Sequence, residues 1–138
     1  MNQAFGLKWT AQLNCMPTRI LKREEVAQKL RDWHRGRISS QELLRWADAI
    51  YPSDDVDYDD WEDDNSVTSE VMAALDMLDM NLSLPEDAPV FLEFLSTPAG
   101  QFQVGYTKYR QALDQIDYPS RRASLRDVPF YAPFLQNQ

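Results

Sequence analysis

Apolar residues recur at helical spacing in several separate segments of the chain. The first segment covers residues 22–35. Its apolar positions are spaced by four and three residues and therefore share one helix face, at Val26, Leu30 and Trp33. Gly36 follows, and glycine accepts the left-handed backbone that often ends a helix. This pattern predicts a helix that ends just before Gly36.

A capping signal predicts a second helix. Ser39 and Glu42 have the spacing of a capping box, in which both side chains bond to backbone N–H groups at the helix start. The helix is expected to run from Ser40 to about Tyr51. Pro52 ends it, because the residue before a proline is pushed out of the helical region. The short connection between these two helices predicts an antiparallel helical hairpin.

Three further helices are predicted toward the C-terminus. One spans about Asn65–Met80, and a shorter one spans about Pro85–Leu95. The third follows Thr97-Pro98 and is closed by Pro119. Its apolar residues give the clearest amphipathic pattern of the chain, at Phe102, Tyr106, Tyr109, Leu113 and Ile116. Gly105 lies within this helix, where a glycine allows a neighbouring helix to approach closely.

The methionines and the two ends of the chain complete the expected fold. Methionine fills irregular gaps, so we expect core filling rather than a binding stripe from Met72, Met77 and Met80. Residues 119–138 are rich in proline and aromatic residues and favour an extended segment over the helices, with a free tail as the alternative. We expect residues 1–18 to form an N-terminal arm, in which Phe5–Trp9 is a candidate short strand. We expect residues 1–138 to form one all-α domain, a bundle of about five helices with an extended C-terminal segment.

Charge is distributed very unevenly along this pattern. The 62 residues between Arg45 and Lys108 contain 15 acidic and no basic residues, whereas the rest of the chain carries all 14 basic residues and 7 acidic ones. The acidic residues are densest in residues 53–65, which we call the acidic segment. Crowded like charges repel one another and create a strong local potential that suits a cationic partner.

The residue types give little support to catalysis or to a bound cofactor. His34 is the single histidine and lies at a predicted helix end, where a solvated capping role is expected. One histidine and one cysteine cannot assemble a catalytic triad or a cysteine zinc site. The four glycines form no phosphate-binding motif. We therefore expect a protein that is not an enzyme and that has no cofactor.

The acidic segment matches a calcium-binding loop only in part. The 1-3-5 spacing of calcium ligands is present at Asp55, Asp57 and Asp59. Asp60 then stands where the sharp turn requires glycine, and Ser66 stands where a bidentate glutamate is required. We therefore expect no specific metal site, although weak binding of divalent cations stays open.

The remaining composition points to a cytoplasmic protein. The lone Cys15 excludes an internal disulfide and fits a reducing compartment. No apolar run approaches the roughly 20 residues that span a membrane, and the first 16 residues make a poor signal peptide. Basic residues surround the first helix, either as an ordinary solvated face or paired with acids of the middle region. The net charge of −8 argues against nucleic acid as a partner.

Two interpretations of the acidic segment remain open. In one it is a solvated loop whose charge keeps the protein soluble, with its aromatic residues anchoring it to the core. In the other it binds a partner, because interface hot spots favour tyrosine and tryptophan amid polar residues. The candidate partner-binding residues are Asp54, Asp55, Asp57, Tyr58, Asp59, Asp60, Trp61, Glu62, Asp63 and Asp64. We expect the first half of the segment to be a loop and Asp60–Asp64 to begin a helix.

The layout of residues 22–95 resembles a known class of small proteins. It combines a helix ending at Gly36, a second helix opened by Ile38-Ser39, an acidic segment, and two apolar helices. The residues that carry the likeness are Trp46-Ala47, Asp57-Tyr58, Leu75, Leu78, Phe91, Leu92 and Leu95. This layout resembles bacterial immunity proteins of the colicin D immunity and contact-dependent growth inhibition types.

The resemblance implies a helical protein that neutralises a toxin, often a nuclease, by covering its active site. A nuclease groove is basic because it holds phosphates, so an inhibitor can place carboxylates where the phosphates lie. We therefore expect an acidic inhibitor that meets a basic toxin domain through its acidic segment. The alternative is an acidic adaptor or regulator that binds a basic peptide or associates with itself.

Overall fold

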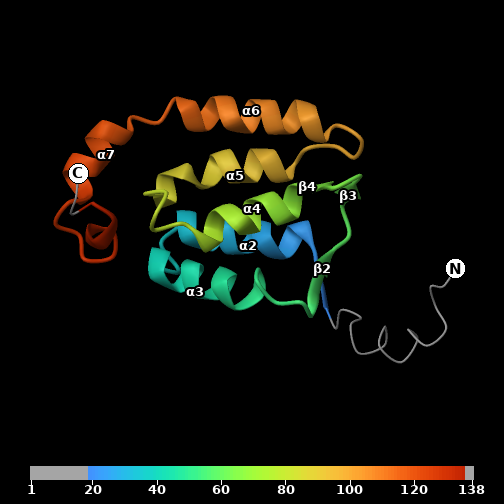
Figure 1. The fold of residues 1–138 in the computed structure, drawn as a ribbon, viewed down its shortest axis with the longest axis horizontal. Helices are drawn as coiled ribbons and strands as arrows, with labels where there is room; N and C mark the ends of the chain where they lie inside the picture. The colour runs from blue at the N-terminus through green and yellow to red at the C-terminus, as the bar shows by residue number, and fades with distance from the viewer. Residues whose placement is uncertain (1–18, 136–138) are drawn as a thin grey trace, which may run out of the picture.

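The computed structural model describes residues 19–135, and this part of the chain is mostly helical (Figure 1). Its six α-helices are α2 (Arg23–His34), α3 (Ser40–Ile50), α4 (Val67–Asp76), α5 (Ala88–Leu95), α6 (Phe102–Asp114) and α7 (Tyr118–Leu125). None of these helices is long and apolar enough to cross a membrane. The expected arm 1–18, its candidate strand Phe5–Trp9 and Cys15 lie outside the described residues.

The first two helices confirm the sequence prediction closely. The Ser39 hydroxyl accepts a hydrogen bond from the Glu42 amide at 3.0 Å, and the Glu42 carboxylate accepts one from the Ser39 amide at 2.8 Å. Gly36 has a φ of 77°, the left-handed conformation expected at the end of α2. The two helices run in opposite directions, as a hairpin requires (Figure 1).

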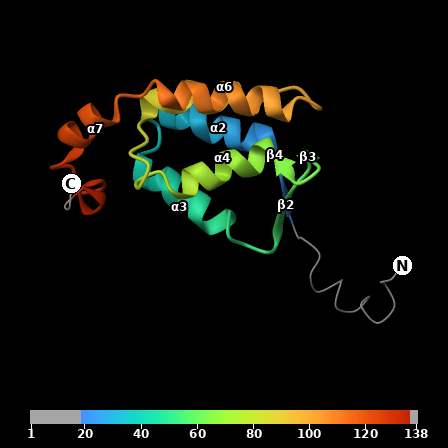
Figure 2. The ribbon, with the colours of Figure 1, turned by 45° about the horizontal axis from the view of Figure 1, so that its top comes forward.

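The helices share one apolar core. α2 packs mainly on α5, α3 on α4, and α6 on α5. α5 lies between α4 and α6 in Figure 1, and Figure 2 shows α3 beside α4. Most of the largest fully buried side chains come from β1 and from helices α2 to α5, and they include Leu21, Leu30, Trp33, Leu43, Met72, Leu75, Phe91 and Phe94. The ring of Phe94 stacks on Tyr109 of α6 with a centroid distance of 4.3 Å. Gly105 lets the side chain of Thr97 approach, because an added Cβ would lie 2.1 Å from its hydroxyl oxygen.

Four short strands make the all-α prediction wrong in part. β1 (Arg19–Leu21) pairs in parallel with β2 (Val56–Tyr58), and β3 (Trp61–Glu62) pairs antiparallel with β4 (Asn65–Ser66). Asp60–Asp64 therefore forms no helical turn. Helix α4 begins only at Val67, where the Ser66 hydroxyl accepts a hydrogen bond from the Ser69 amide.

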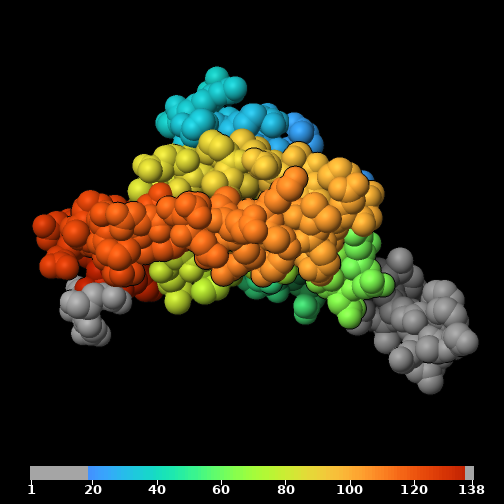
Figure 3. Space-filling view, turned by 90° about the horizontal axis from the view of Figure 1, so that it is seen from above, coloured from blue at the N-terminus to red at the C-terminus, as the bar shows by residue number. Residues whose placement is uncertain are grey.

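The C-terminal segment is packed and largely helical rather than extended. Pro119 lies in the first turn of α7, and a short 3-10 helix, η2, covers Ala132–Phe134. A second 3-10 helix, η1 (Pro85–Asp87), precedes α5. Tyr131 is buried, and its hydroxyl donates a hydrogen bond to the Ser83 carbonyl at 2.6 Å. The free-tail alternative is therefore excluded for residues 119–135. Seen from the side of α6, this segment forms one end of the molecule (Figure 3).

The methionine prediction holds for only one of the three residues. Met72 is fully buried in the core. Met77 and Met80, near the C-terminal end of α4, are 43% and 53% exposed. They therefore contribute apolar surface that faces solvent.

Candidate functional site

The acidic segment is tied to the start of α2 by a continuous register. In the β1–β2 pair, each residue of β1 faces the residue 37 positions later. The same offset continues beyond the strands as two ion pairs. Lys22 Nζ lies 2.7 Å from Asp59 Oδ2, and Arg23 Nε lies 2.9 Å from Asp60 Oδ2. Parallel strands bring their carboxyl ends to the same edge, so the basic and acidic pairs meet there.

Asp60 lies beneath the surface and organises the local fold. Its carboxylate accepts hydrogen bonds from Arg23 and Ser66, and from both the amide and the hydroxyl of Thr68 at 3.0 and 2.8 Å. Burial works to raise the pKa of Asp60, but hydrogen bonds from Ser66, Thr68 and Arg23 outweigh it and hold that pKa below its usual range. An anion at the first turn of α4 also interacts favourably with the helix dipole.

The two aromatic residues of the acidic segment have opposite environments. Tyr58 is buried, and burial raises the pKa of its hydroxyl to about 12. Trp61 is 46% exposed, with its ring edge-on to Tyr58 at a centroid distance of 6.1 Å. The indole N–H of Trp61 donates to Asp57 Oδ1 at 2.9 Å. Tyr58 therefore anchors the segment to the core, and Asp57 fixes an outward-facing Trp61.

Glu62 caps the N-terminus of α6. Its carboxylate accepts hydrogen bonds from the backbone amides of Gly100 at 2.7 Å and Phe102 at 3.3 Å. These amides lie at the start of a helix, where N–H groups lack partners within the helix and an anion is favoured. Glu62 therefore links the acidic segment to the last long helix.

The other acids of the segment face solvent. Asp63 and Asp64 form the two-residue turn between β3 and β4, and Asp63 has a φ of 58°. Aspartate is among the few residues that accept this left-handed conformation. Asp54 and Asp55 are exposed just before β2.

The ten predicted partner-binding residues therefore fall into two groups. The first group makes contacts within the chain and comprises Asp57, Tyr58, Asp60 and Glu62, together with Asp59, which pairs with Lys22 at the surface. An outward position is found for Asp54, Asp55, Trp61, Asp63 and Asp64. The two ion pairs join the basic dipeptide Lys22-Arg23 to the acidic dipeptide Asp59-Asp60. These dipeptides are visible in the sequence, but strands as short as β1 and β2 do not allow the register between them to be predicted.

The described residues include one histidine and no cluster of metal ligands. His34 is exposed at the end of α2. Across residues 19–135, no three histidine, cysteine or acidic side chains are grouped as a metal ion requires. Comparison of the chain with protein-family models, curated proteins and solved structures found no match.

Proposed function

We propose that the protein binds a basic protein partner through its outward-facing acidic residues and Trp61. These residues, Asp54, Asp55, Trp61, Asp63 and Asp64, are called the acidic end. They lie on the stretch of chain that crosses one end of the molecule from α3 to α4 (Figure 1).

The exposed ring of Trp61 is the observation that carries this proposal. A purely solvating loop gains nothing from a large aromatic side chain held outside the core. Trp61 is nevertheless fixed by its hydrogen bond to Asp57 and its contact with Tyr58. A rigid aromatic side chain loses little conformational entropy on binding, and tryptophan is enriched at interface hot spots.

Charge and burial have separate roles in the proposed complex. The carboxylates of the acidic end attract lysine and arginine residues of the partner and accelerate encounter. Trp61 becomes desolvated in the complex and slows dissociation. If the partner is a basic toxin domain, as the resemblance to immunity proteins implies, the carboxylates take the positions of substrate phosphates.

Co-expression with the product of the adjacent gene tests this function. We expect a stable complex and protection of growth when that product is a toxin. Trp61→Ala and the double variant Asp63→Asn/Asp64→Asn are expected to weaken the complex, and asparagine accepts the left-handed backbone at position 63. The double variant Glu93→Gln/Asp127→Asn changes the net charge equally at exposed sites elsewhere and serves as the control.

The outcome separates the proposed function from its alternatives. If both double variants weaken the complex equally, binding depends on the net charge of the protein and not on the acidic end, which contradicts the proposed surface. Failure of the chain to bind or protect against the adjacent gene product would exclude the immunity role. Concentration-dependent self-association lost in Trp61→Ala would favour the adaptor alternative.

A further inference from the structure

A second candidate site lies between α4, α6, α7 and the C-terminal segment. The structure has an open cavity of about 550 Å³ there. Ligand pockets commonly have volumes of about 300–1,000 Å³. α4 and α6 both run from the strands toward α7 (Figure 1), and residues of both helices line the cavity. None of the residues of the acidic end lines it.

One part of the cavity wall is apolar and exposed. Met77 and Met80 from the end of α4, and Phe134 from η2, line the cavity with exposed fractions of 43%, 53% and 37%. Phe91 and Leu113 continue the apolar surface inward. Methionine side chains adapt to the shape of a ligand, which suits a variable apolar body.

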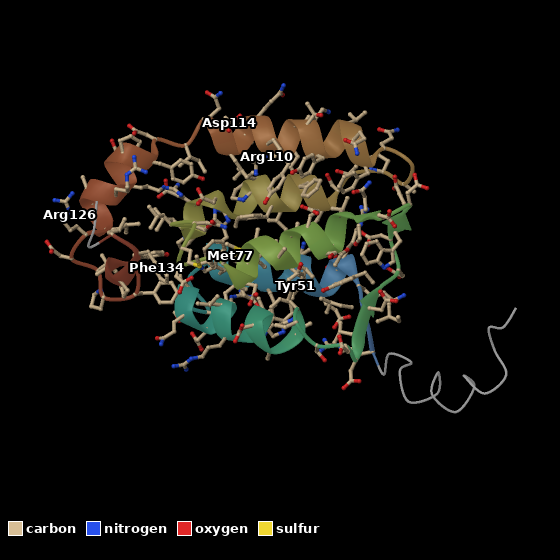
Figure 4. The ribbon with its side chains drawn as sticks, in the orientation of Figure 1. Tyr51, Met77, Arg110, Asp114, Arg126 and Phe134 are labelled. Atoms are coloured by element: carbon tan, nitrogen blue, oxygen red, sulfur yellow. The ribbon has the colours of Figure 1, made fainter. Side chains whose placement is uncertain are left out.

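A second part of the wall is basic. Arg110 of α6 and Arg122 of α7 line the cavity, and neither forms an ion pair within residues 19–135. The neighbouring Arg121 differs, because two hydrogen bonds of 2.6 Å join it to Asp87. Figure 4 shows Arg110 and Met77 on different elements bordering this region, with Phe134 at the α7 end.

Tyr118 adds a hydroxyl to the basic part of the wall. Burial raises the pKa of Tyr118, while the positive charges of Arg121 and Arg110 act to lower it. An anion bound there would receive charged donors from the arginines and a neutral donor from the tyrosine.

Two carboxylates also line the cavity and set the charge of its ligand. Glu70 lies in the first turn of α4, toward the strands and away from α7. Asp114 lies one helical turn after Arg110. At the α7 end of the cavity, the negative charge of Asp114 offsets one of the two positive charges of Arg110 and Arg122. One positive charge therefore remains there. A ligand with a single negative charge balances it.

We propose that this cavity binds a small amphipathic molecule with one anionic group, such as a carboxylate. Arg110 and Arg122 bind the anionic group through charge-assisted hydrogen bonds, and Tyr118 donates a third. The apolar body of the ligand lies against Met77, Met80 and Phe134 and covers their exposed surface. This binding is independent of the acidic end and of its protein partner.

Two fluorescent probes of similar shape test the proposal. Anilinonaphthalene sulfonate carries one negative charge, and N-phenylnaphthylamine carries none. We expect the folded protein to bind the sulfonate saturably at one site, more tightly than the amine, and decanoate to displace it. Arg110→Gln/Arg122→Gln is expected to weaken sulfonate binding about tenfold or more and to leave amine binding unchanged.

The control variant is Arg126→Gln, an exposed arginine outside the cavity lining. It removes one positive charge directly after α7 and is expected to leave sulfonate binding unchanged. In the wild-type protein, methyl NMR signals of Met77 and Met80 are expected to shift on binding, and the signal of buried Met72 is not. This measurement needs no variant and therefore stands even if an arginine variant fails to fold.

Three results would overturn the proposal. Equal affinity for the charged and uncharged probes would remove the role of the arginines. Unshifted signals of Met77 and Met80 would place the probe elsewhere. A dimer in sedimentation that excludes the probe would show that a second copy of the chain covers the cavity.

Discussion

Arg23 and Asp60 form an ion pair of 2.9 Å that connects four parts of the fold. The Arg23 guanidinium also donates to the carbonyls of Leu95, the last residue of α5, and Thr97. Asp60 accepts from Thr68 at the start of α4. Their side chains are 26% and 13% exposed. The densest acidic run of the chain is therefore partly a structural element, whereas Trp61, Asp63 and Asp64 are exposed.

The first prediction concerns the stability contributed by this pair. Asp60→Asn leaves Arg23 partly buried without its counter-ion and removes a charged acceptor from Thr68. We expect the free energy of unfolding to fall by about 2–4 kcal/mol, somewhat less than for a fully buried pair. Denaturant titration measures this change.

The neighbouring ion pair provides the control for that titration. Lys22 and Asp59 have side chains that are 59% and 44% exposed. Asp59→Asn is therefore expected to cost less than about 1 kcal/mol. Equal losses for the two variants would show that Asp60 has no special structural role.

The second prediction is a dependence of stability on pH. The pKa of Asp60 is lower in the folded protein than in the unfolded chain, where it is about 3.9. Its contribution is therefore complete above that value and is lost as the pH falls through the folded-state pKa. We expect the wild-type protein to lose more stability below about pH 4 than Asp60→Asn does. Parallel curves for the two proteins would contradict this.

The third prediction concerns the cap on α6. Glu62→Ala removes the acceptor for the amides of Gly100 and Phe102. We expect a loss of about 1 kcal/mol, as for other N-terminal caps, and faster hydrogen exchange at the start of α6. Asp63→Ala is the control, because it removes an adjacent exposed acid. The left-handed backbone at position 63 adds some loss of stability in this variant. Faster exchange in α6 for both variants would argue against a capping role of Glu62.

The fourth prediction concerns attachment of the C-terminal segment. Arg121 is nearly buried and makes paired hydrogen bonds to Asp87, which strengthen the preference of Arg121 for its charged form. Asp87→Asn removes the buried counter-ion of Arg121 and leaves it only the exposed Glu86 carboxylate, 3.6 Å away. We therefore expect a loss of about 3 kcal/mol. Protease sensitivity near residues 126–135 should rise with it. Unchanged stability would mean that the apolar contacts of Tyr131 and Leu135 hold the segment alone.

The sequence predicted helices best where periodicity and a capping signal coincided. The capping box of Ser39 and Glu42 placed the start of α3 at the observed residue. Pro119 misled the prediction, because proline can end one helix or occupy the first turn of the next. Here Asp117 caps α7, and its carboxylate accepts from the Ser120 amide at 3.1 Å.

The acidic segment was predictable in charge but not in shape. Its strands contain two or three residues each, too few for an alternating pattern to appear, and aspartate is rare in strands. The role of Asp60 depends on Arg23, which lies 37 positions earlier and becomes its neighbour only through the β1–β2 register. Trp61 was identified as a candidate from its residue type, but its exposure depends on this local fold.

The salt dependence of association tests the proposed partner surface most directly. Stopped-flow measurement of the association rate with an inactive form of the adjacent gene product, over increasing sodium chloride, isolates the electrostatic contribution. We predict a rate that falls about tenfold or more from low to high salt, with a lower starting rate and a shallower fall for Asp63→Asn/Asp64→Asn. A rate that is independent of salt, or unaltered in this variant, would contradict binding through the acidic end.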